Sequence, residues 1–142
     1  MAIRLERVID VSAPPEDVWT FISDPEQRAR HISVVEDFSI DGDGSATWHL
    51  SLPIPILDRT IAVETEDVEV RSPEHVKFVG RSRAMRVVGE QDLAETETGT
   101  RLTNRFTVEG RIPGIERFFK KNLEDEFDNL EAGLREFLDG RG

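Results

Sequence analysis

Apolar residues recur every three or four positions through the last segment of the chain, from Gly114 to Leu138. This stripe consists of Ile115, Phe119, Leu123, Phe127, Leu130, Leu134 and Leu138. Charged residues fill the positions between them, so one face is apolar and the opposite face is charged. The 3.6-residue period predicts an amphipathic helix about 36 Å long, at about 1.5 Å per residue. Such a helix must pack its apolar face on another part of the protein.

Upstream of this helix, most apolar residues alternate with polar ones, which is the period of a β-strand. The expected strands cover residues 3–11, 34–40, 46–52, 59–71, 76–80, 85–93 and 102–108. Two proline-led stretches with acidic residues, starting near Pro14 and at Pro25, predict two short helices between the first and second strands. The alternation changes phase within 59–71, which predicts a β-bulge near Thr65–Asp67.

The expected order is therefore one strand, two short helices, six strands and one long helix. Short turns such as Asp41–Gly44 connect neighbouring strands, which predicts an antiparallel sheet. A bent sheet with one apolar face, covered by a long amphipathic helix, is an α+β domain of two layers. Pro53–Leu57 is expected to form an apolar loop, either packed on the core or at the rim of a pocket. No linker or repeat interrupts the pattern, so we expect a single domain over residues 1–142.

The chain carries a net charge of −11 and no cysteine. Nucleic acid and anionic membrane surfaces are poor partners for an acidic chain, and thiol chemistry is excluded. Lysine is rare compared with arginine, a composition typical of halophilic proteins, in which molar salt shortens the Debye length to about 3 Å. An ordinary acidic protein is the alternative. The sequence shows neither a signal peptide nor a transmembrane segment, so we expect a cytoplasmic protein.

The stretch Ile9–Trp19, followed by Ser23–Glu26, resembles the opening signature of the START-like (SRPBCC) superfamily. This superfamily includes the polyketide cyclase/dehydrase group and a group similar to one component of CO dehydrogenase. Gly99–Leu102 and Gly110–Gly114 resemble the turn before its last strand and the approach to its final helix. The resemblance implies a helix-grip fold, in which a curved seven-stranded antiparallel sheet wraps around the C-terminal helix. It also implies a cavity between the two, which in other members holds lipids, polyketides, quinones or hormones.

Four polar residues fall on otherwise apolar strand faces, namely Arg7, Glu36, Gln91 and Asn104. In a helix-grip fold the first strand pairs with the last, which would bring Arg7 near Asn104. The second strand would approach the other edge of the first and bring Glu36 near Arg7. A buried charge without a partner costs several kcal/mol, so these groups should be paired or reached by water. They either anchor the polar group of a ligand or serve structure alone.

The expected ligand-binding residues combine these polar positions with apolar walls. They are Arg7, Glu36, Phe38, Trp48, Met85, Gln91, Asn104, Phe106, Phe119, Leu123 and Phe127. The three histidines lie in separate elements, so no metal site is expected. His49 and His75 should face solvent, whereas His31 is either a helix-end residue or a ligand contact. No nucleotide or cofactor motif is present, so no cofactor is expected.

Three functions follow from this pattern and this resemblance. The first is a non-catalytic protein that binds a hydrophobic or amphipathic small molecule, such as a lipid, quinone or polyketide-like compound, between the sheet and the last helix. The second is an enzyme of the polyketide cyclase/dehydrase type, with Arg7, Glu36 or His31 as acid or base. The third is an accessory factor that binds a protein partner during assembly of a larger enzyme. A solidly packed interior would exclude the first.

Overall fold

The computed structural model describes residues 2–42, 44–53 and 60–141. Its elements in chain order are β1 (Ala2–Val11), α1 (Pro15–Ile22), α2 (Pro25–Arg30), β2 (Val35–Gly42), β3 (Ser45–Leu50), β4 (Ile61–Arg71), β5 (His75–Arg81), β6 (Met85–Glu95), β7 (Thr100–Gly110) and α3 (Ile115–Arg141). The order predicted from the hydrophobic pattern is confirmed. Residues 54–57 of the expected apolar loop lie outside the described residues.

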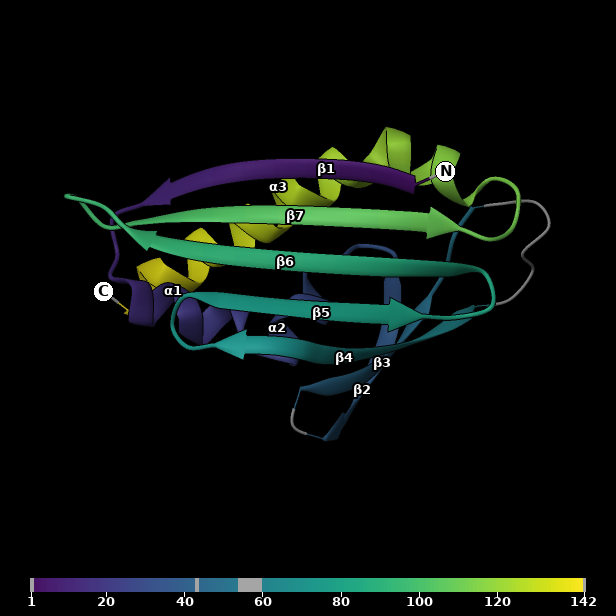
Figure 1. Ribbon diagram of the computed structural model, residues 1–142, viewed down its shortest axis with the longest axis horizontal. Helices are drawn as coiled ribbons and strands as arrows, with labels where there is room; N and C mark the ends of the chain where they lie inside the picture. The colour runs from purple at the N-terminus through teal and green to yellow at the C-terminus, as the bar shows by residue number, and fades with distance from the viewer. Residues whose placement is uncertain (1, 43, 54–59, 142) are drawn as a thin grey trace.

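The seven strands form one antiparallel sheet in the order β1-β7-β6-β5-β4-β3-β2. Figure 1 shows the three helices behind this sheet, with α3 crossing it obliquely. This is the predicted helix-grip architecture. Strands β1 and β2 form opposite edges of the sheet, so residues on them are separated by its full width.

Helix α3 buries the apolar stripe that its sequence predicts. The buried members are Ile115, Phe119, Leu123, Phe127, Leu130 and Leu134. They meet the inward-facing residues of the sheet in two hydrophobic clusters. One cluster lies between strands β3–β7 and the first half of α3. The other cluster packs α1 against the second half of α3. None of the described helices is long and apolar enough to cross a membrane.

Two of the strands contain irregularities that redirect their side chains. In β4 the register with β5 shifts between Asp67 and Glu69, which confirms the bulge predicted near this position. In β2 the register with β3 shifts between Val35 and Asp37, so Glu36 lacks a paired residue. The prediction that Glu36 lies on the inner face is wrong, since this shift changes the parity of the strand and leaves Glu36 exposed.

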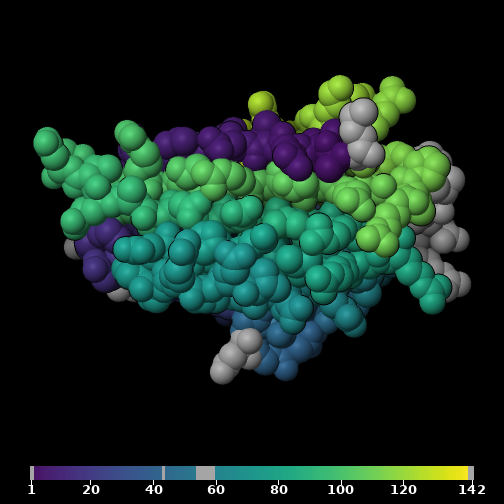
Figure 2. Space-filling model, in the orientation of Figure 1, coloured from purple at the N-terminus to yellow at the C-terminus, as the bar shows by residue number. Residues whose placement is uncertain are grey.

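The outer face of the sheet is covered by side chains that form a continuous surface (Figure 2). Ion pairs join its strands across this face. Arg101 Nε lies 2.9 Å from Asp10 Oδ1, and Arg105 lies 2.8 Å from Glu6 Oε2 and 2.7 Å from Asp92 Oδ2. Hydrogen bonding and attraction from Arg101 lower the pKa of Asp10. The charges of this face are therefore largely paired, and the apolar interior lies on the side of α3.

Candidate functional site: a cavity between the sheet and α3

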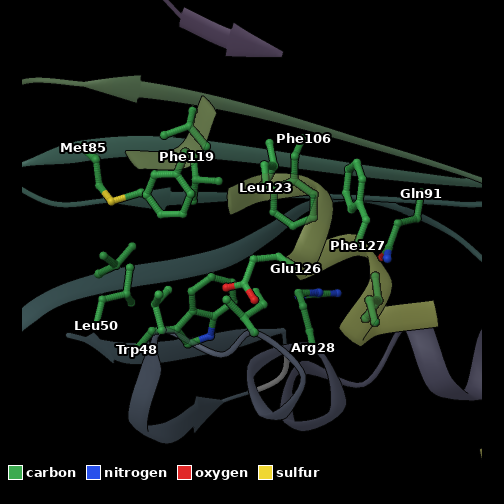
Figure 3. Close-up of a pocket in the computed structure, with 16 residues that line it drawn as sticks. Arg28, Trp48, Leu50, Met85, Gln91, Phe106, Phe119, Leu123, Glu126 and Phe127 are labelled. Atoms are coloured by element: carbon green, nitrogen blue, oxygen red, sulfur yellow. The ribbon is translucent and has the colours of Figure 1, made fainter. Parts of the chain in front are cut away.

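A small cavity of about 40 Å³ lies between the inner face of the sheet and α3 (Figure 3). Its apolar walls are Ile32, Val34, Trp48, Leu50, Val63, Met85, Val87, Phe106, Val108, Phe119, Leu123, Phe127 and Leu130. Arg28, Gln91 and Glu126 complete the lining. Sites for drug-sized ligands measure about 300–1,000 Å³, and a single water needs about 10–15 Å³. In this conformation the cavity has room for a few waters, and a larger guest requires wall side chains to move.

Four side chains on this wall carry a buried polar atom without a hydrogen-bond partner in the described part of the chain. These atoms are Arg28 Nε, Trp48 Nε1, Gln91 Oε1 and Glu126 Oε2. Buried polar groups in native proteins are hydrogen-bonded in the great majority of cases. The concentration of such atoms around one apolar space indicates a place where water or a ligand supplies the missing partners.

Glu126 is held in place by donors from the turn between α2 and β2 and from α3 itself. Its Oε1 accepts hydrogen bonds from Ser33 N at 3.0 Å, Ser33 Oγ at 2.8 Å and Asn129 Nδ2 at 3.0 Å. The residue is buried at 6% exposure and lines the cavity, and its Oε2 has no hydrogen-bond partner among the described residues. The carboxylate is therefore oriented before any ligand arrives.

Arg28 reaches the cavity from α2 and is held by several groups of the fold. Its Nη1 donates to Asp67 Oδ1 at 2.9 Å, and its Nη2 donates to the carbonyl of Ile22 at 3.2 Å. The guanidinium also lies 4.4 Å from the centroid of the Phe78 ring. Burial lowers the pKa of Arg28, although attraction from Asp67 opposes this shift. The bulge in β4 thus supplies the counter-ion for this buried cation.

Of the residues expected from the sequence, one group meets at this cavity. It consists of Trp48, Met85, Gln91, Phe106, Phe119, Leu123 and Phe127. Phe38 is half-buried and packs against the same hydrophobic cluster without lining the cavity. Their roles in binding stay predictions.

The other polar candidates lie away from the cavity. Arg7 pairs in register with Asn104, as expected from the β1–β7 pairing. Its guanidinium, however, hydrogen-bonds to Asp128 and lies 3.8 Å from Glu131 on α3, not near Glu36. The proposed approach of Glu36 to Arg7 is wrong, since β2 and β1 are at opposite edges of the sheet. Asn104 is completely buried opposite Gln91 in the β6–β7 register and does not line the cavity, and both of its amide atoms are unpartnered among the described residues.

His31 and His75 do not line the cavity either. His31 Nδ1 lies 2.8 Å from the carbonyl of Gln27, and the ring lines a surface groove over α3. The prediction that His75 faces solvent is wrong. It points to the outer face, but its ring is covered where Nδ1 lies 2.6 Å from Asp92 Oδ1 and Nε2 lies 3.1 Å from Glu69 Oε1. In the described part of the chain, no cluster of three or more potential ligands is placed to hold a metal.

Arg28 and Glu126 are the polar cavity residues that the sequence analysis missed, and seven apolar lining residues were also absent from the expected set. For Glu126 a signal exists, since it follows Leu123 by three positions and precedes Leu130 by four, which places it on the apolar stripe of α3. For Arg28 the sequence offers no comparable signal, because its direction depends on where the six-residue α2 packs.

The model of one protein family, described as polyketide cyclase/dehydrase and lipid transport, matches residues 2–135. The chain belongs to this family. Membership agrees with the START-like (SRPBCC) resemblance of the sequence. The family description covers both enzymatic and transport functions, so it supports either ligand binding or a cyclase activity. No curated protein sequence matches the chain.

Solved structures with the same fold include members of this superfamily. A START superfamily protein from Mycobacterium smegmatis has a TM-score of 0.76 and 11% identity, with 98% of this chain and 99% of that chain covered. A conserved protein from Geobacillus kaustophilus has a TM-score of 0.75 and 18% identity, with 96% of each chain covered. An aromatase/cyclase from Streptomyces sp. R1128 has a TM-score of 0.73 and 15% identity, covering 96% of this chain and 94% of that one. At these identities the likeness shows the fold alone.

Proposed function

We propose that the protein binds a hydrophobic or amphipathic small molecule in the cavity between the sheet and α3. The observation that carries this proposal is the set of four buried polar atoms that lack partners, among the described residues, on an otherwise apolar wall. Each buried polar group left unsatisfied costs about 1–3 kcal/mol. A guest that hydrogen-bonds to these atoms recovers part of that cost, and apolar burial adds about 25 cal/mol per Å².

The small resting volume requires the cavity to expand when the ligand enters. Met85 is suited to this movement, because its unbranched side chain adapts to irregular space. Phe119 and Leu123 also line an outer cleft beside the start of β1, so their displacement would connect the cavity with solvent. A lipid, quinone or polyketide-like molecule would then lie with its apolar part along the first half of α3.

The test is native mass spectrometry of the purified protein, alone and after incubation with 2-naphthol or 1-octanol. We expect a bound molecule in the wild type and its loss in Val34→Phe, which fills the cavity. Val35→Phe is the matched control, since Val35 is an equally half-buried neighbour that does not line the cavity. Absence of any bound species from the wild type, or equal binding by both variants, would contradict the proposal.

A second candidate function is a cyclase/dehydrase-type enzyme. Glu126 favours it, because a carboxylate oxygen free in a water-poor cavity can accept a proton from a carbon next to a carbonyl group. Glu126 would then be the base, and Arg28 would donate a hydrogen bond to the oxygen on which negative charge develops, since Arg7, Glu36 and His31 do not line the cavity. Deuterium exchange at the carbon between the carbonyls of a β-ketothioester, followed by NMR, tests this activity. Exchange no faster than in buffer, or unchanged in Glu126→Gln, would exclude it.

A further inference from the structure

The two charged side chains that line the cavity, Arg28 and Glu126, have different kinds of partner. The charge of Arg28 is compensated by Asp67, whose carboxylate lies 2.9 Å away. Glu126 instead receives hydrogen bonds from neutral groups, the backbone and hydroxyl of Ser33 and the amide of Asn129. Its second oxygen, Oε2, has no hydrogen-bond partner among the described residues, so the cavity wall carries a carboxylate acceptor without a donor.

We propose that Glu126 selects ligands whose polar end donates a hydrogen bond, above all a hydroxyl group, and that it rejects ligands with a carboxylate. This selectivity rests on the proposed binding function. A hydroxyl can donate to Glu126 Oε2 and accept from Trp48 Nε1 or Arg28 Nε with the same oxygen. Figure 3 shows all three of these side chains reaching into the cavity. One small neutral group thus meets both kinds of unpartnered atom found among the described residues.

A carboxylate ligand fits this arrangement poorly. It could accept from Trp48 and Arg28, but it would place a second negative charge near Glu126. In a low-dielectric interior the repulsion between like charges is many times stronger than in water. Arg28 offers limited compensation, because its guanidinium already binds Asp67 and the carbonyl of Ile22. An amine can donate to Glu126, but when protonated it cannot accept a hydrogen bond from the other two groups.

The substitution Glu126→Gln reverses this selectivity by a geometric argument. The donors from Ser33 and Asn129 all point at Oε1, so a glutamine keeps its carbonyl oxygen at that position. Its amide nitrogen then occupies the cavity-facing position. The cavity exchanges an acceptor for a donor, with almost no change in side-chain size. A purely structural role for Glu126 would weaken all ligands alike and would not reverse their order.

The experiment compares matched probes by isothermal titration calorimetry. The probes are 2-naphthol, 2-methoxynaphthalene, which lacks the donor, and 2-naphthoate, which adds the negative charge, together with 1-octanol and octanoate. We expect each hydroxyl probe to bind the wild type at least about tenfold more tightly than the matching probes without a hydroxyl, because hydrogen bonds to charged groups are stronger than those between neutral groups. In Glu126→Gln we expect naphthoate to bind more tightly than naphthol. Asp125→Asn is the control, since it removes one charge from the neighbouring exposed position.

Each outcome of this titration supports or overturns the selectivity proposed for Glu126. Wild-type binding of naphthoate or octanoate as tight as that of the matching hydroxyl probe would overturn the role of Glu126 and leave the proposed binding function intact. An equal loss for all probes in Glu126→Gln would likewise overturn it. If no probe of either shape binds the wild type, both the selectivity and the proposed function fall. The wild-type comparison needs no variant, so it holds even if Glu126→Gln folds poorly.

Discussion

The imidazole ring of His31 lies against Gly133 of α3, so close that a Cβ atom at position 133 would stand 2.3 Å from His31 Cδ2. The ring is held from its other sides, with Nδ1 2.8 Å from the carbonyl of Gln27 and its centroid 5.3 Å from that of Phe21. This contact joins the end of α2 to the second half of α3. It therefore fixes the two helices that carry Arg28 and Glu126 relative to each other.

Gly133→Ala should destabilise the protein in spite of better helix propensity. Alanine is favoured over glycine in a helix by about 1 kcal/mol, but here its methyl group would displace the His31 ring. In the His31→Ala background the same change should stabilise by about 1 kcal/mol. Urea unfolding of the four proteins measures this cycle, with Gly140→Ala as a control because a Cβ there meets nothing within 4 Å. Equal stabilisation in both backgrounds would refute the packing role of Gly133.

The buried pair of Arg28 and Asp67 supports a second prediction. Their side chains are 4% and 9% exposed, so neither charge is well hydrated. Asp67→Asn should lower the free energy of unfolding by about 3–5 kcal/mol, because it leaves the Arg28 charge buried without its counter-ion. The double variant Arg28→Met, Asp67→Asn should regain most of that loss.

The comparison for this pair is Glu26→Gln, which removes the exposed ion pair with Arg30. Exposed pairs contribute about 0–1 kcal/mol, so this variant should remain close to the wild type. Unfolding in urea measures all three proteins. A loss of less than about 1 kcal/mol in Asp67→Asn, well short of the cost of breaking a buried pair, would show that Arg28 finds other compensation.

The elements of this fold were predictable because their signals are local and periodic. The stripe in α3, the alternation in the strands and the phase change at the β4 bulge are each visible in a short window of sequence. The pairing of Arg7 with Asn104 followed once the sheet order was assumed. Periodicity sufficed there, since the backbone of a strand or helix dictates which residues share a face.

The site was less predictable because it depends on packing between elements. Glu126 was hidden among the many charged residues of α3, although its position on the stripe was readable. The direction of Arg28 is set by Asp67, which lies 39 positions away in the sequence. Glu36 was misplaced by a bulge that interrupts β2, and His75 was misjudged because acidic side chains from two other strands cover its ring.

Asn104 provides a third prediction, since it is fully buried and neither amide atom has a partner among the described residues. Asn104→Leu should raise the free energy of unfolding by about 1 kcal/mol or more, because it removes unsatisfied polar groups at similar volume. Thr100→Val is the contrasting case, since Thr100 Oγ1 donates to the carbonyl of Ala13 at 2.6 Å and its loss should destabilise. Thermal unfolding compares the two variants. A lower melting temperature for Asn104→Leu would show that ordered water satisfies the amide.

Asp92 gives the protein a dependence of stability on acid pH. Burial opposes its ionisation, but hydrogen bonds from His75 and Arg105 outweigh this effect and lower its pKa. A carboxyl group with a lowered folded-state pKa stabilises the fold above its unfolded value of about 3.9, and this contribution is lost as the pH falls through the folded value. The urea midpoint should therefore fall less between about pH 7 and pH 3 in Asp92→Asn than in the wild type. Asp125→Asn, exposed on α3, should keep the wild-type difference, and an unchanged difference in Asp92→Asn would refute the assignment.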